Sequence, residues 1–254
     1  MYEKDGERYF IVDAHIAFWN AAWAKVVERH VCAWAHAEHG IGLYVYTPAQ
    51  RDAPSNMINN ALAVGATHKL RFAQDLILYN LDISESLEGF DGSAHRHAWQ
   101  DDPVWQGVRE TVERLTATRD WAEAFFATAL VFEPLVGELF RSHFVMQVAA
   151  PHGDYVTPAI MGTGEADTAR EQRGARRLFD LLLNDPQHAD ANRAVLQQWL
   201  EKWTPASLAA ARRLQPVWSQ VPEKVVSFEE SLGRARSRFT DLLDDLGLES
   251  PKEV

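Results

Sequence analysis

The chain has 254 residues, 46% of them hydrophobic, enough to bury a sizeable core in one large domain or two modest ones. Its 36 acidic and 25 basic residues give a formal net charge of −11, which disfavours nucleic acid and anionic membrane surfaces as partners. The single cysteine, Cys32, excludes an internal disulfide framework and suits a reducing cytoplasm. Because the sequence also lacks a signal peptide and a run of 18 apolar residues, we expect a cytoplasmic protein.

Residues 1–20 differ in pattern from the rest, so we expect an atypical N-terminal segment followed by one domain over residues 21–254. The segment contains a short β-type run at residues 9–12. The domain opens with apolar residues at spacings of three and four, which predicts a helix. Gly40 and Gly42 are expected to loosen that helix.

A second long helix is expected over about residues 55–81, where apolar positions cover most of the circumference. Residues 84–102 contain glycines and polar residues and are expected to form a loop. Asp102 followed by Pro103 makes a good N-cap and first helical residue, which predicts a helix through Leu115.

A third long helix is predicted over residues 121–147. It opens with a capping box formed by Asp120 and Glu123. Its apolar residues cover nearly every face, so other helices must surround it. Four residues inside it are polar or interrupt helical hydrogen bonding, namely Glu133, Pro134, Glu138 and His143.

After a turn, a fourth helix is expected over residues 157–183, and three shorter amphipathic helices follow it. These shorter helices are expected to start after Pro186, at Thr204-Pro205 and at Ser227, with Gly247 capping the last. The sequence therefore predicts an all-α protein, a helical bundle with additional C-terminal helices.

Carboxylates in a buried helix raise the question of a di-iron site. Such bundles use one Glu from each of two helices and a Glu-x-x-His pair from each of the other two. The chain contains no Glu-x-x-His motif. The nearest analogues are His68-x-x-Arg71-x-x-Gln74 on the second helix and Glu165-x-x-Thr168 on the fourth.

Arg71 cannot bind iron, because its guanidinium has no lone pair to offer. In a bundle interior its charge would need a carboxylate partner, for which Glu133, Glu165 or Asp75 would serve. We therefore expect a polar cluster in place of a metal centre, and no catalytic, cofactor-binding or metal-binding residue in this chain.

Other polar residues give weaker signals. Many amidohydrolases present two metal-binding histidines as Asp-x-His-x-His at a strand end, but here only Asp13 and His15 are present. Cys32 is expected in the core, and His95 and His97 on a solvated surface. The nine tryptophans, which include Trp199 and Trp203 one turn apart, suit a large core or a protein interface.

Several long strings resemble a known family. They are VFEPLVGELFR at 131–141, HGDYVTP at 152–158, HKLRFAQDLILYN at 68–80, EGFDGSAH at 88–95, DPVWQG at 102–107, ANRAVLQQW at 191–199 and LQPVWS at 214–219. Over about residues 21–254 the chain resembles the beta (small) subunit of the hydroxylase of soluble di-iron monooxygenases, closest to the propane-oxidising type.

The resemblance implies a ferritin-like bundle without iron ligands. Such a chain would be a non-catalytic scaffold that pairs with an alpha subunit, the holder of the di-iron centre, in an α₂β₂ assembly. A coupling protein and an NADH-dependent reductase would serve this complex, which would hydroxylate a small hydrocarbon such as propane. The alternatives are an autonomous small metal-dependent enzyme, either a di-iron oxidase or an amidohydrolase-related hydrolase, and an amidohydrolase fragment.

The N-terminal segment departs from this family pattern. Beta subunits usually carry a longer N-terminal region, whereas residues 1–20 resemble the opening of an amidohydrolase. We hypothesise a junction near Trp19 to Trp23, natural or artefactual, between an unrelated start and a shortened beta subunit.

Overall fold

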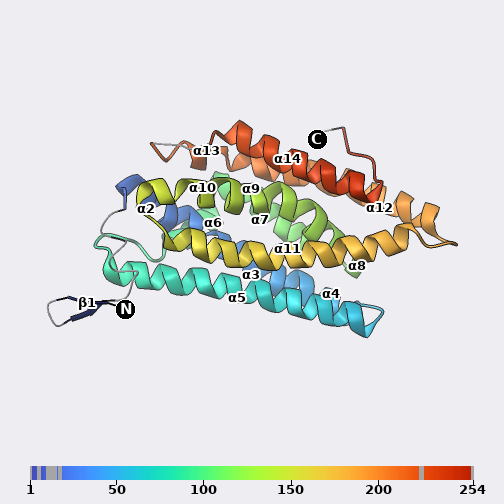
Figure 1. Cartoon of the computed structure of the whole chain (residues 1–254), viewed down its shortest axis with the longest axis horizontal. Coiled ribbons are helices and arrows are strands. Elements are labelled where there is room, and N and C mark those ends of the chain that lie inside the picture. The colour runs from blue at the N-terminus through green and yellow to red at the C-terminus, as the bar shows by residue number, and fades with distance from the viewer. Residues whose placement is uncertain (1, 5–6, 10–15, 17–18, 223–225, 253–254) are drawn as a thin grey trace.

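The computed structural model of the chain describes residues 2–4, 7–9, 16, 19–222 and 226–252. Figure 1 shows long helices lying side by side, with α5 along one edge of the molecule and α14 along the opposite edge. The strands β1 (Tyr2–Lys4) and β2 (Glu7–Tyr9) pair antiparallel in a small N-terminal hairpin. Residues 10–15, which include most of the predicted β-type run and His15, lie outside the described residues.

The first long helical run begins after Asn20, whose side chain accepts a hydrogen bond from the N–H of Ala22 at 2.8 Å. Its segments are α2 (Ala21–Val26), η1 (Val27–Val31), α3 (Trp34–Gly40), η2 (Ile41–Tyr46) and α4 (Thr47–Asp52), of which η1 and η2 are π-helical. The prediction that Gly40 and Gly42 loosen the helix holds in part: the run stays helical, but its hydrogen bonding changes from α to π after Gly40. A Cβ at Gly42 would lie 2.9 Å from the carbonyl oxygen of Ala66, so this glycine lets the next helix approach closely.

The second long helix, α5 (Asn56–Ser86), begins where predicted. Ser55 caps it by accepting a hydrogen bond from the N–H of Ile58 at 3.3 Å. The helix continues beyond the predicted end at Leu81, and Ile83 in this extension is buried in the core.

The predicted loop at residues 84–102 is wrong in its second half, which forms the helix α6 (Ala94–Asp101). α6 packs against η1 and α7, and this tertiary packing outweighs the polar composition of the stretch. α7 (Pro103–Thr116) follows as predicted, with the Asp102 carboxylate accepting a hydrogen bond from the N–H of Val104 at 3.0 Å.

The third long run confirms the predicted helix, and the Asp120 carboxylate accepts hydrogen bonds from the N–H groups of Ala122 and Glu123. Its segments are α8 (Trp121–Phe126), η3 (Ala127–Gly137), α9 (Glu138–Phe140), η4 (Arg141–Val145) and α10 (Met146–Val148). Pro134 lies within η3, where π-helical hydrogen bonding keeps the run continuous around the missing N–H. Every residue of η3 is buried, as expected for a helix surrounded by others.

A short turn, η5 (Ala150–His152), and Gly153 at φ 86° lead into the fourth long helix, α11 (Val156–Leu183), which confirms the prediction. The C-terminal helices are α12 (Ala189–Arg213), α13 (Gln215–Trp218) and α14 (Phe228–Leu246). Ser227 caps α14 and Gly247, at φ 62°, ends it, as predicted.

The predicted helix break at Thr204-Pro205 is wrong, because α12 runs through both residues. The missing N–H of Pro205 leaves the carbonyl of Glu201 without its helical partner, and Glu201 lies on the exposed side. Burial of Trp203 and Ala210 on the opposite side holds the helix against the core. Packing therefore outweighs the local cost of the proline.

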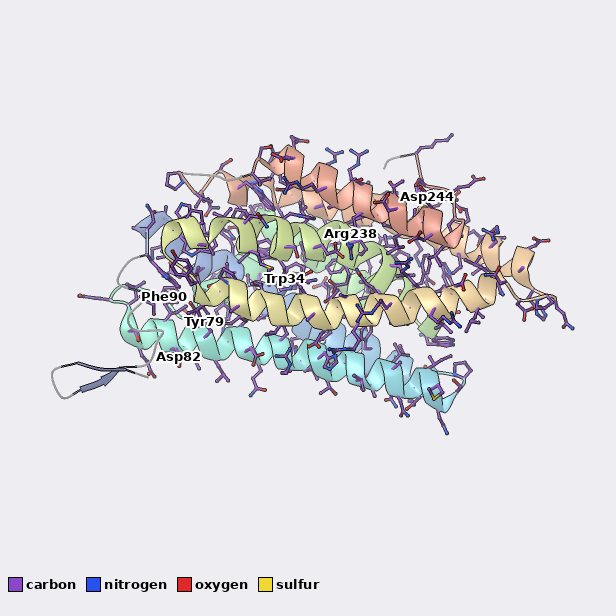
Figure 2. The ribbon with its side chains drawn as sticks, in the orientation of Figure 1. Trp34, Tyr79, Asp82, Phe90, Arg238 and Asp244 are labelled. Carbon is purple, nitrogen blue, oxygen red and sulfur yellow. The ribbon has the colours of Figure 1, made fainter. Side chains whose placement is uncertain are left out.

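The tryptophans belong to the core of this chain. Five of them are fully buried, namely Trp23, Trp34, Trp105, Trp203 and Trp218, and all of the others, Trp199 included, are partly buried. Figure 2 shows Trp34 among the helices near the middle of the molecule, and Arg238 and Asp244 on α14 near its edge. The alternative that the tryptophan content serves a protein interface is therefore wrong for these five residues.

The prediction of a helical bundle with additional C-terminal helices is confirmed, with the small hairpin as the departure from all-α. Cys32 is buried in the core as predicted. Within the described part of the chain, no helix combines the length and the apolar character needed to cross a bilayer.

Candidate functional site

The interior of the bundle contains a cluster of buried charges. Glu38 on α3, Lys69 on α5, Glu133 on η3 and Arg141 on η4 are all buried, with residue exposures between 0 and 5%. These residues come from three of the long helical runs. Taking four charged groups out of water is costly unless each is paired.

Each charge in the cluster has partners of opposite sign. Lys69 Nζ contacts Glu133 Oε1 and lies 3.2 Å from Glu38 Oε2. Arg141 donates from Nη1 to Glu38 Oε1 at 3.0 Å and from Nη2 to Glu133 Oε2 at 2.6 Å. The two carboxylates therefore each bridge both cations, in a closed ring of alternating charges. Although burial raises the pKa of Glu133, the charges of Arg141 and Lys69 hold it well below its ordinary value.

α11 completes the cluster with Glu165, which accepts a hydrogen bond from Arg141 Nε at 2.5 Å. The Glu165 side chain is 20% exposed, so it connects the buried ring to the surface. Gly137, one helical turn from both Glu133 and Arg141, leaves the space that the guanidinium fills. A Cβ at Gly137 would lie 2.8 and 2.9 Å from the two terminal nitrogens of Arg141.

A second carboxylate of α11, that of Glu171, lies beside the ring. Its pKa is shifted upward, whereas that of Glu133 is shifted downward. Tyr46 donates a hydrogen bond from its hydroxyl to Glu171 Oε1. Burial raises the pKa of Glu171 to about 7, against the opposing influence of the Lys69 charge. A cavity of about 10 Å³ adjoins Glu38, Lys69 and Glu171, which is room for no more than about one water molecule.

The cluster does not fit a di-iron centre. Lys69-x-x-Phe72 and Glu165-x-x-Thr168 lie where the bundle interior would need Glu-x-x-His pairs. The ammonium of Lys69 and the guanidinium of Arg141 offer no lone pair, and their positive charges repel a metal cation. Among the described residues, no group of three or more His, Cys, Asp or Glu side chains is arranged to hold a metal ion.

The predicted interior position of Arg71 is wrong, whereas Asp75, one of its three predicted carboxylate partners, does pair with it. Its side chain is 39% exposed and pairs with Asp75 and, at 2.8 Å, with Asp167, rather than filling the interior. The register expected for α5 was off by one residue, because Lys69 and Phe72 are buried whereas His68 and Arg71 lie at the edge.

Glu133 and Glu165, predicted as carboxylate partners, do hold an interior cation, but it is Arg141. Four members of the cluster were therefore missed from the sequence: Glu38, Lys69, Arg141 and Glu171. The available signal was the spacing of Glu133, Gly137 and Arg141, which puts a small residue between two opposite charges on one helix.

Glu138 and His143, the other polar residues of the third long run, lie outside the cluster. Glu138 is buried and forms an ion pair with Arg238 of α14 at 2.5 Å, and it accepts a hydrogen bond from Gln172 at 3.0 Å. His143 is partly buried, and burial lowers its pKa. Glu138 thus joins α14 to the bundle.

The prediction of a solvated surface is wrong for His95 and holds for His97, which is exposed. His95 is buried on α6, with its Nδ1 3.0 Å from Nε2 of His36 on α3. Burial, followed by the proximity of His95, lowers the pKa of His36 to about 4. The pair therefore joins α6 to α3 as two neutral imidazoles that share one hydrogen bond.

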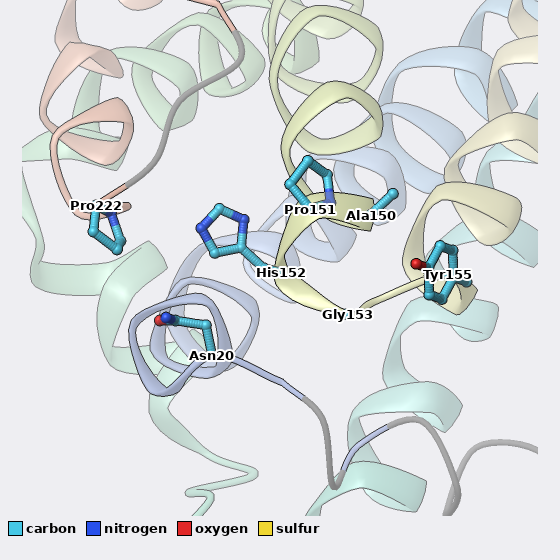
Figure 3. Close-up of a pocket in the computed structure, with 7 residues that line it drawn as sticks. All are labelled: Asn20, Ala150, Pro151, His152, Gly153, Tyr155 and Pro222. Atoms are coloured by element: carbon cyan, nitrogen blue, oxygen red, sulfur yellow. The ribbon is translucent and has the colours of Figure 1, made fainter.

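A surface hollow of about 440 Å³ lies where the third long run turns into α11 (Figure 3). It is lined by Asn20, Ala150, Pro151, His152, Gly153, Tyr155 and Pro222. His152 Nδ1 is committed to the carbonyl oxygen of Val148 at 2.8 Å.

Comparison with known proteins places the chain among hydroxylases. A model of the methane/phenol/alkene hydroxylase family matches residues 10–186. Over 93% of its length the chain is 54% identical to the small subunit of the propane 2-monooxygenase hydroxylase component from Gordonia sp. (strain TY-5). Over 99% of its length it is 52% identical to the corresponding Mycolicibacterium goodii protein. The chain spans 64% of the length of the first relative and 67% of the second.

A solved structure of toluene 4-monooxygenase shares the fold. It superposes with a TM-score of 0.74 at 25% sequence identity, over 81% of this chain and 67% of that chain. The predicted ferritin-like bundle is thereby confirmed. The predicted resemblance to hydroxylase small subunits is confirmed as well.

Proposed function

Because the chain belongs to the methane/phenol/alkene hydroxylase family, we propose that it is the non-catalytic small subunit of a multicomponent di-iron monooxygenase. The observation that carries this proposal is the ring of Glu38, Lys69, Glu133 and Arg141, which fills the bundle interior with paired charges. Two of its four side chains are cations that offer no lone pair to a metal. This interior therefore lacks the ligands that an iron centre needs.

The di-iron centre belongs, in this proposal, to a larger alpha subunit of the same hydroxylase. The relatives' designation as a small subunit of a hydroxylase component supports such a partner. The full assembly is α₂β₂, supplied with electrons from NADH by a reductase and assisted by a coupling protein. Its substrate is a small hydrocarbon such as propane, in keeping with the names of the relatives.

The role of this chain is mechanical. The Arg141 and Lys69 contacts tie α3, α5, η3 and α11 together at their centre, so that the four long runs present a fixed outer surface. A fixed surface lowers the entropy lost when a partner binds. We place the scaffold in residues 21–254, treat residues 1–20 as a separate segment, and assign the protein to the cytoplasm.

Iron analysis and reconstitution test the proposal. The chain is expressed alone, the larger hydroxylase subunit of the same source alone, and the two together. Iron content and hydrocarbon oxidation are then measured with the reductase and coupling protein present. We expect no stoichiometric iron in the isolated chain, and full activity only in the co-expressed complex.

Two results would contradict it. About two irons per isolated chain would favour the autonomous metal enzyme. Full activity of the larger subunit without this chain would remove the scaffold role.

A further inference from the structure

The outward side of α5 carries one ion pair, between Arg71 and Asp75, and is otherwise uncharged over most of its length. Between Asn56 and Leu81, a stretch that the structure describes completely, every other exposed residue is uncharged. The large apolar ones are Met57, Val64, Leu78 and Leu81, with exposures of 79, 51, 50 and 49%. We call this surface the α5 face. At 1.5 Å per residue it is about 39 Å long.

α14 shows how a solvated helix of the same chain differs. Most of its exposed residues are charged, among them Arg238 and Asp244, which Figure 2 shows on the edge of the molecule opposite α5. Charged residues make up 24% of the chain, so their scarcity on the α5 face is a departure from this composition. Depletion of charge is the compositional mark of the centre of a protein interface.

Charges border the α5 face at both ends. Arg51 and Asp52 are exposed before it, and Asp82 and Glu85 are exposed after it. A centre with a single internal ion pair and a rim with exposed charges is typical of an interface.

α11 lies against α5 and extends this surface. The two helices approach so closely that a Cβ at Gly164 of α11 would lie 2.7 Å from the ring of Phe72 of α5. Tyr155, which precedes α11, and the exposed residues in the first half of this helix, which the structure describes completely, are also uncharged; the latter are Ala159, Thr163 and Ala166. With helices about 10 Å wide, both parts offer roughly 500–600 Å², near the lower end of what one partner contributes to a stable interface.

We infer that the α5 face is the docking surface for the larger hydroxylase subunit, an inference that rests on the proposed function. The occupant must present a largely uncharged helical surface of similar length, because the charges on the α5 face, Arg71 and Asp75, already pair with each other. Its association is driven by apolar burial, and it is therefore weakly dependent on salt.

A second copy of this chain fits the α5 face less well. A twofold contact brings the same patch together on both sides. Pairing two α5 helices antiparallel about their middle would bring the Arg71–Asp75 pairs of both copies together and bury all four charges. A larger subunit, which the small-subunit relatives indicate as the partner, needs to cover only one such pair.

Charge insertion on the α5 face tests the inference. The double variant Val64→Glu/Leu78→Glu is co-expressed with the larger subunit of the same source, and the complex is quantified by size-exclusion chromatography. The matched control is Leu181→Glu/Val195→Glu, which changes residues of similar exposure, 58 and 41%, outside the face. Circular dichroism and thermal melting verify that both variants fold.

We expect at least a tenfold loss of complex for Val64→Glu/Leu78→Glu, and wild-type yield for the control. Equal binding by both variants would overturn the docking surface while leaving the proposed function intact. Homodimers of the wild-type chain that the α5 substitutions dissociate would also overturn it. Failure of the wild-type chain to bind the larger subunit would instead refute the proposed function.

Discussion

Arg141 and Trp34 donate hydrogen bonds to the same oxygen, Oε1 of Glu38, from Nη1 at 3.0 Å and from the indole Nε1 at 2.6 Å. The guanidinium also lies over the indole ring, with Cζ 5.2 Å from the ring centroid. The aromatic core and the charge cluster are therefore one packed unit. A substitution in the aromatic core should therefore also change the stability of the charge cluster, and the reverse should hold as well.

Replacement of Arg141 by Met should destabilise the fold strongly, because Glu38 and Glu133 would be left buried beside a single cation. Breaking a buried ion pair from one side costs about 3–5 kcal/mol. Urea unfolding followed by circular dichroism measures the loss. The control is Arg234→Met, which removes an exposed i,i+4 pair with Glu230 on α14 and should cost less than about 1 kcal/mol. Similar losses in the two variants would contradict the cluster's structural role.

Gly137→Ala should also weaken the fold, because the added methyl group occupies the space of the Arg141 guanidinium. Overpacking of this kind costs about 1–3 kcal/mol. Gly174→Ala on α11 is the matched control, since a Cβ there meets nothing within 4 Å. That change should stabilise the helix by about 0.5–1 kcal/mol. Opposite signs in the two unfolding free energies are the expected result, and a stabilising Gly137→Ala would refute the steric argument.

Glu171 should make stability fall as pH rises through the weakly acidic range. Its ordinary pKa is 4.5, and burial raises the pKa in the folded chain to about 7. Between these values the folded protein holds a proton that the unfolded chain releases, so the free energy of unfolding decreases with pH and levels off above about 7. The decrease attributable to this group should be about 1–3 kcal/mol.

Glu171→Gln should remove that slope, and unfolding free energies at pH 5, 6, 7 and 8 measure it. Glu113→Gln, which changes a side chain that is 63% exposed on α7, serves as the control. A slope that persists in Glu171→Gln would assign the pH dependence to another group.

His30 should resist protonation. Trp105 Nε1 donates to its Nδ1 at 3.0 Å, while its Nε2 lies 3.0 Å from Gln220 Oε1, so the neutral ring satisfies both neighbours. Burial lowers the pKa of His30 from 6.5 to about 4. Because the unfolded chain binds this proton first, the group's contribution to stability is lost as pH falls from about 6.5 to 4.

An NMR titration of the imidazole checks this directly. The Trp105→Phe variant should raise the pKa of His30, because it removes the N–H that opposes a proton on Nδ1. A His30 ring that titrates near 6.5 in the wild-type chain would contradict the prediction.

The sequence was a good guide to where helices begin and a poor guide to where they bend. Asp102, Asp120 and Ser227 all cap helices as predicted, because capping depends on contacts within a few residues. The predicted break at Pro205 failed because distant packing decides whether a helix survives a proline.

The sequence predicts that the bundle interior holds a polar cluster, but it does not identify most of the residues that form this cluster. A polar cluster without Glu-x-x-His was expected, yet Arg71 was assigned to it in place of Lys69. The π-helical segments explain part of this difficulty for the third long run, since each shifts the spacing of buried positions away from 3.6 residues. Glu38 and Glu171 could be connected with the cluster only after the four helical runs were placed together.

The N-terminal hypothesis stays a prediction. The alignment with the Mycolicibacterium goodii protein covers 99% of the chain and so extends into residues 1–20. Ile16 is buried, and the N–H of Asn20 donates to the carbonyl oxygen of His152 at 3.2 Å, so the end of this segment contacts the bundle.

The alternating ring of Glu38, Lys69, Glu133 and Arg141 also limits how substitutions could convert this interior into a metal site. Turning it into an iron site would require exchanging both cations for ligands, and either exchange alone leaves surplus negative charge shut away from water. Each such single substitution should therefore destabilise the fold, unless a carboxylate takes up a proton in compensation.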